Sequence, residues 1–242
     1  MYVDKEKCVS CGSCVPYCPM QALSIGDDGL DIDRDECVEC NICFRSEVCP
    51  GDALEIKMLD WPRVIRSVFS DPRLIHKVTG MPGRGTEEMK TNDVTNRLCL
   101  GHIGIAIEMG RPGTGTWFYD VEKMAMGVAI HEVEFEALNP VTNLIVDRAT
   151  GQINPEVLNE KVLSAIIEFA IPIEKTAEVL RTIRSLAAEI ETVFSLAISS
   201  RVGDDGGLPQ EAPVQQAGLN LSINGKTNVG LGRPGERGEN RA

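Results

Sequence analysis

The sequence predicts an α+β protein with two modules and an extended C-terminal tail, and three observations support that prediction. Eight of the nine cysteines fall within the first 50 of the 242 residues. Hydrophobic patterns typical of strands and helices then alternate between residues 101 and 201. Beyond residue 202 the chain is rich in Gly, Pro, Asn and Gln. We therefore expect a cysteine module at 1–57, a helical linker and polar loop at 58–100, an α/β sandwich at 101–201, and a tail at 202–242.

Composition and charge argue against a nucleic-acid-binding or membrane protein and favour metal or redox chemistry. The chain has 36 acidic and 24 basic side chains, for a formal charge of −12, so we expect no nucleic-acid partner. The N-terminus lacks an apolar leader, and no run of 18 apolar residues occurs, so we expect a cytoplasmic protein without membrane insertion. Nine cysteines in such a chain favour metal or redox chemistry over structural disulfides.

Two sets of four cysteines share one spacing pattern. The sets read Cys8-x2-Cys11-x2-Cys14-x3-Cys18-Pro19 and Cys37-x2-Cys40-x2-Cys43-x5-Cys49-Pro50. In each, three closely spaced thiolates can wrap three corners of a cubane cluster from one tight loop, with backbone N–H groups pointing at the sulfurs. Zinc is the alternative, because paired CxxC units also bind zinc. Two complete sets of four, each ending in Cys-Pro, favour iron–sulfur clusters.

Residues 4–57 resemble the bacterial ferredoxins that carry two [4Fe-4S] clusters. The internal repeat is also visible where Met20-Gln-Ala-Leu-Ser-Ile matches Gly51-Asp-Ala-Leu-Glu-Ile, and each repeat is expected to end in a helical turn and a short strand. The resemblance implies low-potential electron transfer and crossed ligation, in which the fourth cysteine of each set binds the other cluster. The implied ligand sets are Cys8, Cys11, Cys14 and Cys49 for one cluster, and Cys37, Cys40, Cys43 and Cys18 for the other.

One departure from that family lies in the second set, where five residues, Phe44 to Val48, separate Cys43 from Cys49 instead of the usual three. We expect this insertion to bulge the loop without changing the ligands. The clusters would add further negative charge to an acidic chain. We therefore expect an electron donor or acceptor protein with a basic docking patch.

The second module shows two rounds of strand, helix and strand. The expected strands are Ile103–Met109, Val133–Leu138, Ala165–Ile173 and Thr192–Ser199, and the expected helices are Trp117–Ile130 and Glu174–Ile190. Two such β-α-β units resemble a ferredoxin-like α/β sandwich of the ACT type, with helices on one face of a sheet. In the linker, Asp60-Trp-Pro and Asp71-Pro each predict an N-cap followed by a short helix.

Glycine-rich and basic segments at 81–116 are candidate ligand-binding loops. Gly110-Arg-Pro-Gly-Thr-Gly-Thr can offer backbone N–H groups to a phosphate or carboxylate. A flexible turn with Thr116 as N-cap is the favoured alternative, because the spacing matches neither the dinucleotide fingerprint nor the P-loop. The candidate clamp for a carboxylated substrate consists of Arg84, Lys90, Arg97 and Arg111. His102 and His131 are candidate proton donors, with structural roles as the alternative. Cys99, flanked by leucines, is expected to be a buried thiol rather than a ligand.

Three functions are compatible with these features. The first is an iron–sulfur subunit of an anaerobic multi-subunit reductase that passes electrons to a flavin or metal centre on a partner. The second is a reductase acting directly on a carboxylated substrate, because residues 81–95 and 108–113 resemble 6-hydroxynicotinate reductase-type iron–sulfur proteins, which implies an N-heteroaromatic ring. The third is a redox-responsive sensor that binds a small metabolite.

The tail from residue 202 to 242 offers too few apolar groups to form its own core. Leu219, Leu221 and Ile223 alternate as in an extended segment with one buried face, and Val229 and Leu231 follow. We expect this stretch to be an assembly element that lies on the surface of other subunits, where it can add a strand to a sheet.

Overall fold

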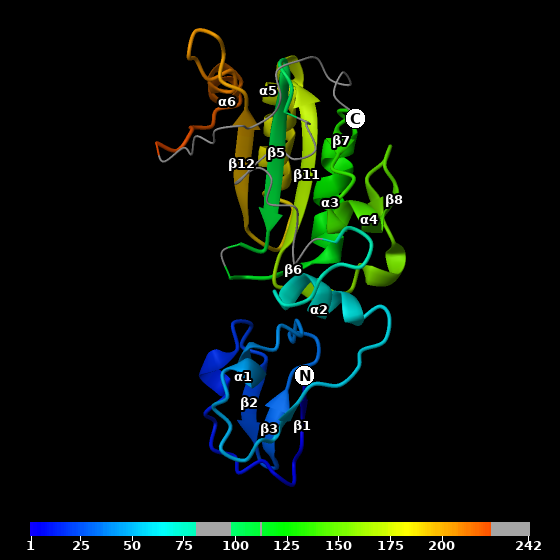
Figure 1. The fold of residues 1–242 in the computed structure, drawn as a ribbon, viewed down its shortest axis with the longest axis vertical. Coiled ribbons are helices and arrows are strands. Elements are labelled where there is room, and N and C mark those ends of the chain that lie inside the picture. The colour runs from blue at the N-terminus through cyan, green and yellow to red at the C-terminus, as the bar shows by residue number, and fades with distance from the viewer. Residues whose placement is uncertain (81–97, 112, 224–242) are drawn as a thin grey trace.

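The computed structural model describes residues 1–80, 98–111 and 113–223 (Figure 1). The N-terminal module, blue in Figure 1, lies at one end of the molecule, and helix α2 lies between it and the larger second domain. The candidate residues Arg84, Lys90, Arg97, Val229 and Leu231 lie outside the described residues.

The N-terminal module contains only short elements. These are β1 (Tyr2–Val3), a 3-10 helix (Val15–Tyr17), β2 (Leu23–Gly26), β3 (Gly29–Ile32), α1 (Ile42–Arg45) and β4 (Leu54–Glu55). Strand β1 pairs antiparallel with β4, and β2 pairs with β3 as a hairpin. The small core combines a few aliphatic side chains, such as Leu30 and Val38, with the cysteines themselves. So small a core leaves the cysteine sites as the main source of cohesion.

A four-stranded antiparallel sheet forms the centre of the second domain. Its order is β12 (Phe194–Ser200), β5 (His102–Met109), β11 (Ala165–Pro172) and β7 (Glu134–Phe135). The two central strands carry alternating large apolar residues, and Ile105 lies opposite Phe169 in their register. The two central strands therefore present one apolar face.

Helices α3 (Phe118–Ala129) and α5 (Thr176–Leu186) pack against each other and cover that apolar face. In Figure 1, α5 lies behind the sheet and α3 is seen beside β11. Helix α5 buries Val179, Leu180 and Ile183 at helical spacing. Strands β5, β11 and β12 and both helices lie where the hydrophobic pattern predicts them. The expected strand at 133–138 is only two residues long, because β7 pairs with β11 at just Phe169 and Ala170.

Smaller elements join β7 to β11. They are α4 (Pro140–Leu144), β8 (Ile145–Asp147), β9 (Gln152–Ile153), a 3-10 helix (Pro155–Val157) and β10 (Lys161–Val162). Strand β8 pairs with β9, and β10 pairs with β6 (Thr116–Trp117) just before α3. Trp117 therefore occupies the N-cap position of α3, and the expectation that Thr116 is the N-cap is wrong.

Helix α2 (Val64–Ser70) is the first part of the second domain rather than a free linker. Its Ile65 and Phe69 belong to the core of that domain. The Phe69 and Phe118 rings pack edge to face, with 5.2 Å between their ring centres. The expected second helix after Asp71 is absent from residues 71–80. Asp71 instead ends α2 in an extended conformation, which is favoured for a residue that precedes proline. Its carboxylate accepts hydrogen bonds from Asn41 and Arg73.

The tail begins differently from the expected extended segment. Residues Glu211–Gln216 form helix α6, which packs on α5 and buries Val214. Leu219 and Leu221 pack against the core of the same domain, whereas Ile223 is 99% exposed. Up to residue 221 the tail therefore packs against its own domain and is not a free extended segment. An assembly role for residues beyond 223 remains a prediction.

Candidate metal centres

Two cavities in the N-terminal module are each lined by four cysteines. One is lined by Cys8, Cys11, Cys14 and Cys49, together with apolar neighbours such as Ile25 and Leu54. The other is lined by Cys18, Cys37, Cys40 and Cys43, with neighbours such as Met20 and Leu23. Hereafter these are the outer site and the inner site. In both, the fourth cysteine comes from the other half of the sequence repeat, so Cys18 and Cys49 exchange places.

The two cysteine loops share one backbone conformation. Ser10 and Glu39, each one residue before the middle cysteine, both have φ of 54°. Gly12 and Asn41, each one residue after it, have φ of 71° and 57°. Alternation of left-handed and right-handed residues turns successive N–H groups to one side of the chain, as in anion-binding nests. The sequence repeat therefore produces a structural repeat suited to a negatively charged group.

Backbone N–H groups also reach the cysteine sulfurs directly. Ala22 and Ala53 donate to Cys18 Sγ and Cys49 Sγ at 3.2 and 3.3 Å. Leu30 donates to Cys8 Sγ at 3.4 Å. Such N–H···S bonds favour thiolate over thiol and tune the potential of a bound iron–sulfur cluster.

The thiols of each site are close enough to affect one another's ionisation. Burial, followed by the charges of Cys40, Cys18 and Cys37, raises the pKa of Cys43 to about 12. Burial is also the main cause that raises the pKa of Cys14, and Cys49 is the first thiol to add to it. Four thiolates in one cavity therefore need a positively charged centre to remain deprotonated together.

The donor set fits a cubane cluster. Four thiols line each cavity, and thiolates are the ligands that [4Fe-4S] clusters take. Within the described residues, no group of three or more His, Cys, Asp or Glu side chains is arranged to hold a single metal ion. The five residues between Cys43 and Cys49, two more than usual, form the end of α1 and a turn at Glu47, and Cys49 still lines the outer site.

The surroundings of the two sites differ. In the outer site Cys11 is exposed, and the lining residues Val9 and Ile25 are 66% and 43% exposed. In the inner site Cys37, Cys40 and Cys43 are all buried. The second domain contributes to that burial, because Leu163 packs against the cysteine core. Met20 lies so close to Gly115 that a Cβ added there would be 2.6 Å from the Met20 methyl group.

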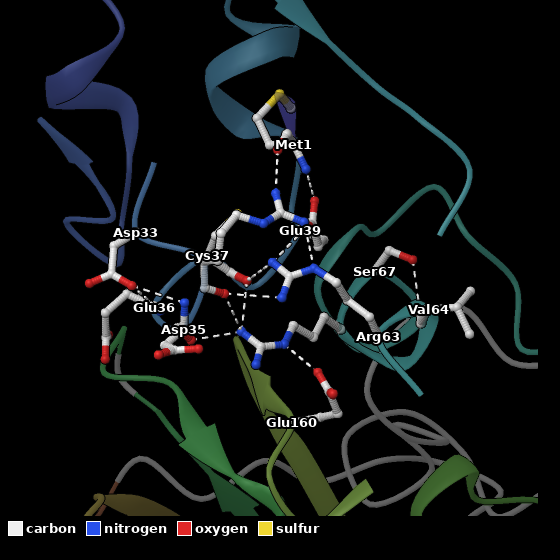
Figure 2. Close-up of polar contacts among 12 residues, drawn as sticks. Met1, Asp33, Asp35, Glu36, Cys37, Glu39, Arg63, Val64, Ser67 and Glu160 are labelled. Carbon is white, nitrogen blue, oxygen red and sulfur yellow. Dashed lines mark hydrogen bonds and ion pairs between the residues drawn. The ribbon is translucent and has the colours of Figure 1, made fainter. Parts of the chain in front are cut away.

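Arginine side chains from α2 and from its N-cap residue hold the inner-site loop, as Figure 2 shows for Arg63. Arg66 donates to the carbonyl oxygens of Asp35 and Cys37 at 2.7 and 3.0 Å, and it pairs with Glu160 of the second domain. Arg63 pairs with the buried Glu39 at 2.8 Å and donates to the Cys37 carbonyl at 3.4 Å. Neither arginine was predicted from the sequence. Their i,i+3 spacing at the start of a helix, which places them on one face, was the available signal.

The other candidate residues do not gather into one site. Arg111 pairs with Glu108 at 2.6 Å, and His102 lies at the opposite end of β5, about 20 Å from Glu108 at roughly 3.3 Å per residue. His131 is buried between helices and contacts Thr182 at 2.8 Å. Cys99 is buried, as expected. No described contact joins either histidine to a cysteine site.

The glycine-rich loop after β5 is close-packed on one side. A Cβ at Gly110 would be 2.8 Å from the backbone of Gly115 and 2.9 Å from that of Leu163. Gly110 has no room for a side chain because the backbone of Leu163, just after β10, passes close to it. Gly115 has none because Met20 and the carbonyl oxygen of Val162 lie against it. Gly113 has no atom within 4 Å of an added Cβ.

These loops and thiol sites define a 4Fe-4S iron–sulfur protein, and comparison with known proteins agrees. The family description "4Fe-4S binding domain" matches residues 1–24. A ferredoxin of Methanothermococcus thermolithotrophicus is 38% identical over 58 residues, which cover 23% of this chain and 93% of that protein. The chain therefore belongs to the ferredoxin family through about a quarter of its length, the part that carries the two sets of cysteines.

Two further relatives are components of larger enzymes. Pyruvate synthase subunit PorD of Methanothermobacter marburgensis is 36% identical over 56 residues, which cover 23% of this chain and 63% of that protein. One component of the H(2):CoB-CoM heterodisulfide,ferredoxin reductase of the same organism is 33% identical over 72 residues. That match covers 22% of this chain and 11% of the relative, so the chain spans about a tenth of its length. No solved structure matches the chain.

Membrane-spanning helices are absent from the described part of the chain. Within residues 1–80, 98–111 and 113–223, no helix is long and apolar enough to cross a bilayer.

Proposed function

We propose that the chain carries two [4Fe-4S] clusters and works as the iron–sulfur subunit or domain of an anaerobic multi-subunit reductase. The single observation that supports this most strongly is the exchange of Cys18 and Cys49 between two four-cysteine cavities. In this proposal Cys8, Cys11, Cys14 and Cys49 hold the outer cluster, and Cys37, Cys40, Cys43 and Cys18 hold the inner cluster. When bound, the clusters supply one-electron chemistry, while the chain fixes their ligands and limits their contact with water.

The test is metal analysis of the protein purified without oxygen. We expect about eight iron and about eight acid-labile sulfide per chain, because each cubane holds four of each. Zinc in place of iron, or iron and sulfide for only one cubane, would refute the proposal. The relatives that are components of larger enzymes support a role within a complex, and co-purification of the native partners tests that part.

The outer site is the proposed docking surface for a redox partner. Its exposed apolar rim, Val9 and Ile25, lies beside the exposed carboxylates of Asp27, Asp28 and Asp31 on the β2–β3 hairpin. An apolar centre with acidic neighbours is complementary to a partner that presents a basic rim around its own flavin or metal centre. The second domain covers the inner site, so the outer site is the accessible one.

Charge reversal tests this surface. We expect D27K/D28K to slow electron exchange with a basic redox partner at least tenfold at low salt, and the difference to shrink as salt screens the charges. The matched control is D204K/D205K, which reverses two exposed charges in the second domain. Equal slowing by both pairs would indicate a general effect of net charge and would contradict a local docking surface.

A second candidate is a reductase that binds a carboxylated substrate, such as an N-heteroaromatic acid, in the second domain. The contact of Met20 with Gly115 favours it, because it brings the inner site against the loop that follows β5. Cofactor analysis and reduction assays on the isolated chain separate the two candidates. Substrate reduction by this chain alone would support the second.

The second domain is proposed to be a ferredoxin-like sandwich. The antiparallel order β12-β5-β11-β7, with α3 and α5 on one face, supports this arrangement. We also propose a cytoplasmic location, from the sequence, and an assembly role for the residues beyond 223. Light scattering on a chain truncated after Ile223 tests the assembly role, and an unchanged assembly state would contradict it.

A further inference from the structure

Positive side chains are distributed unequally between the two cysteine sites. Arg45 donates to the Cys40 carbonyl at 3.1 Å, and both Arg63 and Arg66 donate to the Cys37 carbonyl. All three hydrogen bonds end on the loop of the inner site. Among the described residues, no lysine or arginine side chain has a hydrogen bond to the carbonyl of Cys8, Cys11 or Cys14.

The ion pairs around the inner-site loop leave guanidinium groups in excess. Arg34 and Arg63 share one carboxylate, that of the buried Glu39, at 3.3 and 2.8 Å. Arg66 pairs with Glu160, and Arg45 has no ion pair with an acidic side chain among the described residues. These four guanidinium groups thus pair with two carboxylates. The nearby carboxylates of Asp71 and Glu36 have their own cationic partners, Arg73 and Lys161, so they do not cancel this excess.

The outer site has a different electrostatic setting. No arginine precedes Arg34 in the sequence. The nearby Lys5 and Lys7 are largely exposed and paired with Asp31 and Asp4 at 2.7 and 3.1 Å. Water and salt screen such exposed charges, whereas the side chain of Arg66 is only 4% exposed. A positive charge at Arg66 therefore acts on its surroundings with much less screening.

Reduction of an iron–sulfur cluster adds one electron and therefore one negative charge, which nearby positive groups stabilise. Building on the proposed function, we propose that Arg66, supported by Arg63 and Arg45, raises the reduction potential of the inner cluster. An electron taken from an external redox partner at the outer site then comes to rest at the inner site, beside the second domain.

Burial acts in the opposite direction, because it removes the water that stabilises an added negative charge. The excess guanidinium charge lies within the same buried region and offsets that loss. Arg66 is a positioning residue, since it acts through the carbonyl oxygens of the loop and touches no cysteine sulfur in the described contacts. The role of Arg66 is therefore measured as a change in the reduction potential of the inner cluster rather than as a change in activity.

The experiment is a redox titration, followed by EPR, of the complete protein with both clusters loaded. We expect R66Q to lower one of the two potentials and leave the other unchanged. We expect the equilibrium constant for electron transfer from the outer to the inner cluster to fall at least tenfold. For a one-electron couple, this corresponds to a decrease of about 59 mV in the reduction potential of the inner cluster. R66K keeps the charge and should retain most of the wild-type potential.

Two further variants separate electrostatics from structural damage. E160Q removes the negative partner of Arg66 and should raise the same potential, a shift opposite in sign to that of R66Q. K5Q removes an exposed positive charge near the outer site and should leave both potentials unchanged. If R66Q does not retain its clusters, the sign of the E160Q shift decides the question, together with whether R66K keeps most of the wild-type potential.

Three results would overturn the inference. They are unchanged potentials in R66Q, equal lowering of both potentials, and a shift of the same sign in R66Q and E160Q. Fewer than two clusters in the wild-type protein would refute the proposed function itself, and this inference with it. Iron and sulfide content measured on each sample distinguishes the two kinds of failure.

Discussion

The outer and inner sites have the same cysteine spacing and the same loop conformation, yet their surroundings are opposite. The outer site has an exposed cysteine, Cys11, and an exposed apolar rim. The inner site has three buried cysteines and is held by arginines from α2 and from its N-cap residue. Both sites exchange their fourth cysteine, so neither is independent of the other.

The difference shows that ligands and environment come from separate parts of the chain. The sequence repeat within residues 4–57 supplies eight thiols and two similar loops. The second domain, which lies outside the repeat, then buries one site and leaves the other open. Ligation is thus symmetric, whereas solvent access and charge are not, and these last two properties set the potential of a cluster.

Substitution of Cys18 or Cys49 should have the largest effect on the two sites, because each variant should lose one whole cluster. We expect C18A to lose the inner cluster, although Cys18 follows the outer-site cysteines in sequence, and C49A to lose the outer cluster. Each variant should retain about half of the iron, measured with sulfide content and EPR. C99A is the control and should keep both clusters, because Cys99 lines neither cavity. Loss of the sequence-adjacent cluster in either variant would contradict the exchange.

Truncation of Phe69 should weaken the inner site through the second domain. Phe69 is fully buried against Phe118, so F69A should lower the free energy of unfolding by about 3–5 kcal/mol. Because α2 carries Arg66, the inner cluster should also be lost sooner than the outer one during unfolding in urea. F44A removes a 40% exposed ring and should change stability by less than about 1 kcal/mol. Simultaneous loss of both clusters in F69A would show that the sites are not separable.

Alanine substitutions at two glycines of the same loop test the contact between the cysteine module and the second domain. Gly115 and Gly113 both have positive φ, 73° and 62°, so alanine at either position costs about 1 kcal/mol from backbone conformation. Only at Gly115 would the new methyl group collide with Met20, which should cost a further ~1–3 kcal/mol. Urea unfolding and the rate of iron release should therefore change more in G115A than in G113A. Equal effects would mean that the contact does not hold the modules together.

The smallest expected effect concerns Asp71, which accepts a hydrogen bond from Asn41 of the inner-site loop at 3.0 Å. Burial raises the pKa of Asp71, but hydrogen bonds from Arg73 and Asn41 outweigh it and lower the pKa to about 2. A lowered pKa means that this carboxylate stabilises the fold above its ordinary pKa of 3.8 and loses that effect as pH falls toward 2.

The wild-type protein should therefore be more stable than D71N near pH 7, and the difference should shrink below about pH 4. Urea midpoints of both proteins across this range measure it. A difference that does not change with pH would show that the carboxylate charge has no part in the effect.

Much of the fold could be predicted because its signals are local. The alternation of apolar residues at 103–109 needs no partner to be recognised, and the observed strand β5 covers 102–109. Two-residue strands such as β6 and β10 carry no comparable pattern, since only their pairing with each other defines them. Asp71 misled the prediction because its carboxylate does accept a hydrogen bond from the backbone N–H of Arg73, as an N-cap would, yet no helix follows in residues 71–80. Its contact with Asn41, 30 residues earlier, has no signal in the sequence.

The same distinction applies to the candidate sites. The cysteine spacing identified the thiols that line both cavities, because the motif lies within two short segments. The contacts of Arg63 and Arg66 with the Cys37 carbonyl span 26 and 29 residues and depend on how α2 packs. The composition of the tail likewise hid the apolar contacts of Leu219 and Leu221, which a short helix, α6, brings against the domain.

The contact of Met20 with Gly115 also bears on biosynthesis. The second domain is translated after the cysteine module, and its docking closes one side of the cavity that Cys18 and Cys37 line. Delivery of a cluster from a scaffold protein needs direct access to these thiols. We therefore expect loading of the inner site to precede docking of the second domain, so that the order of synthesis along the chain matches the order of maturation.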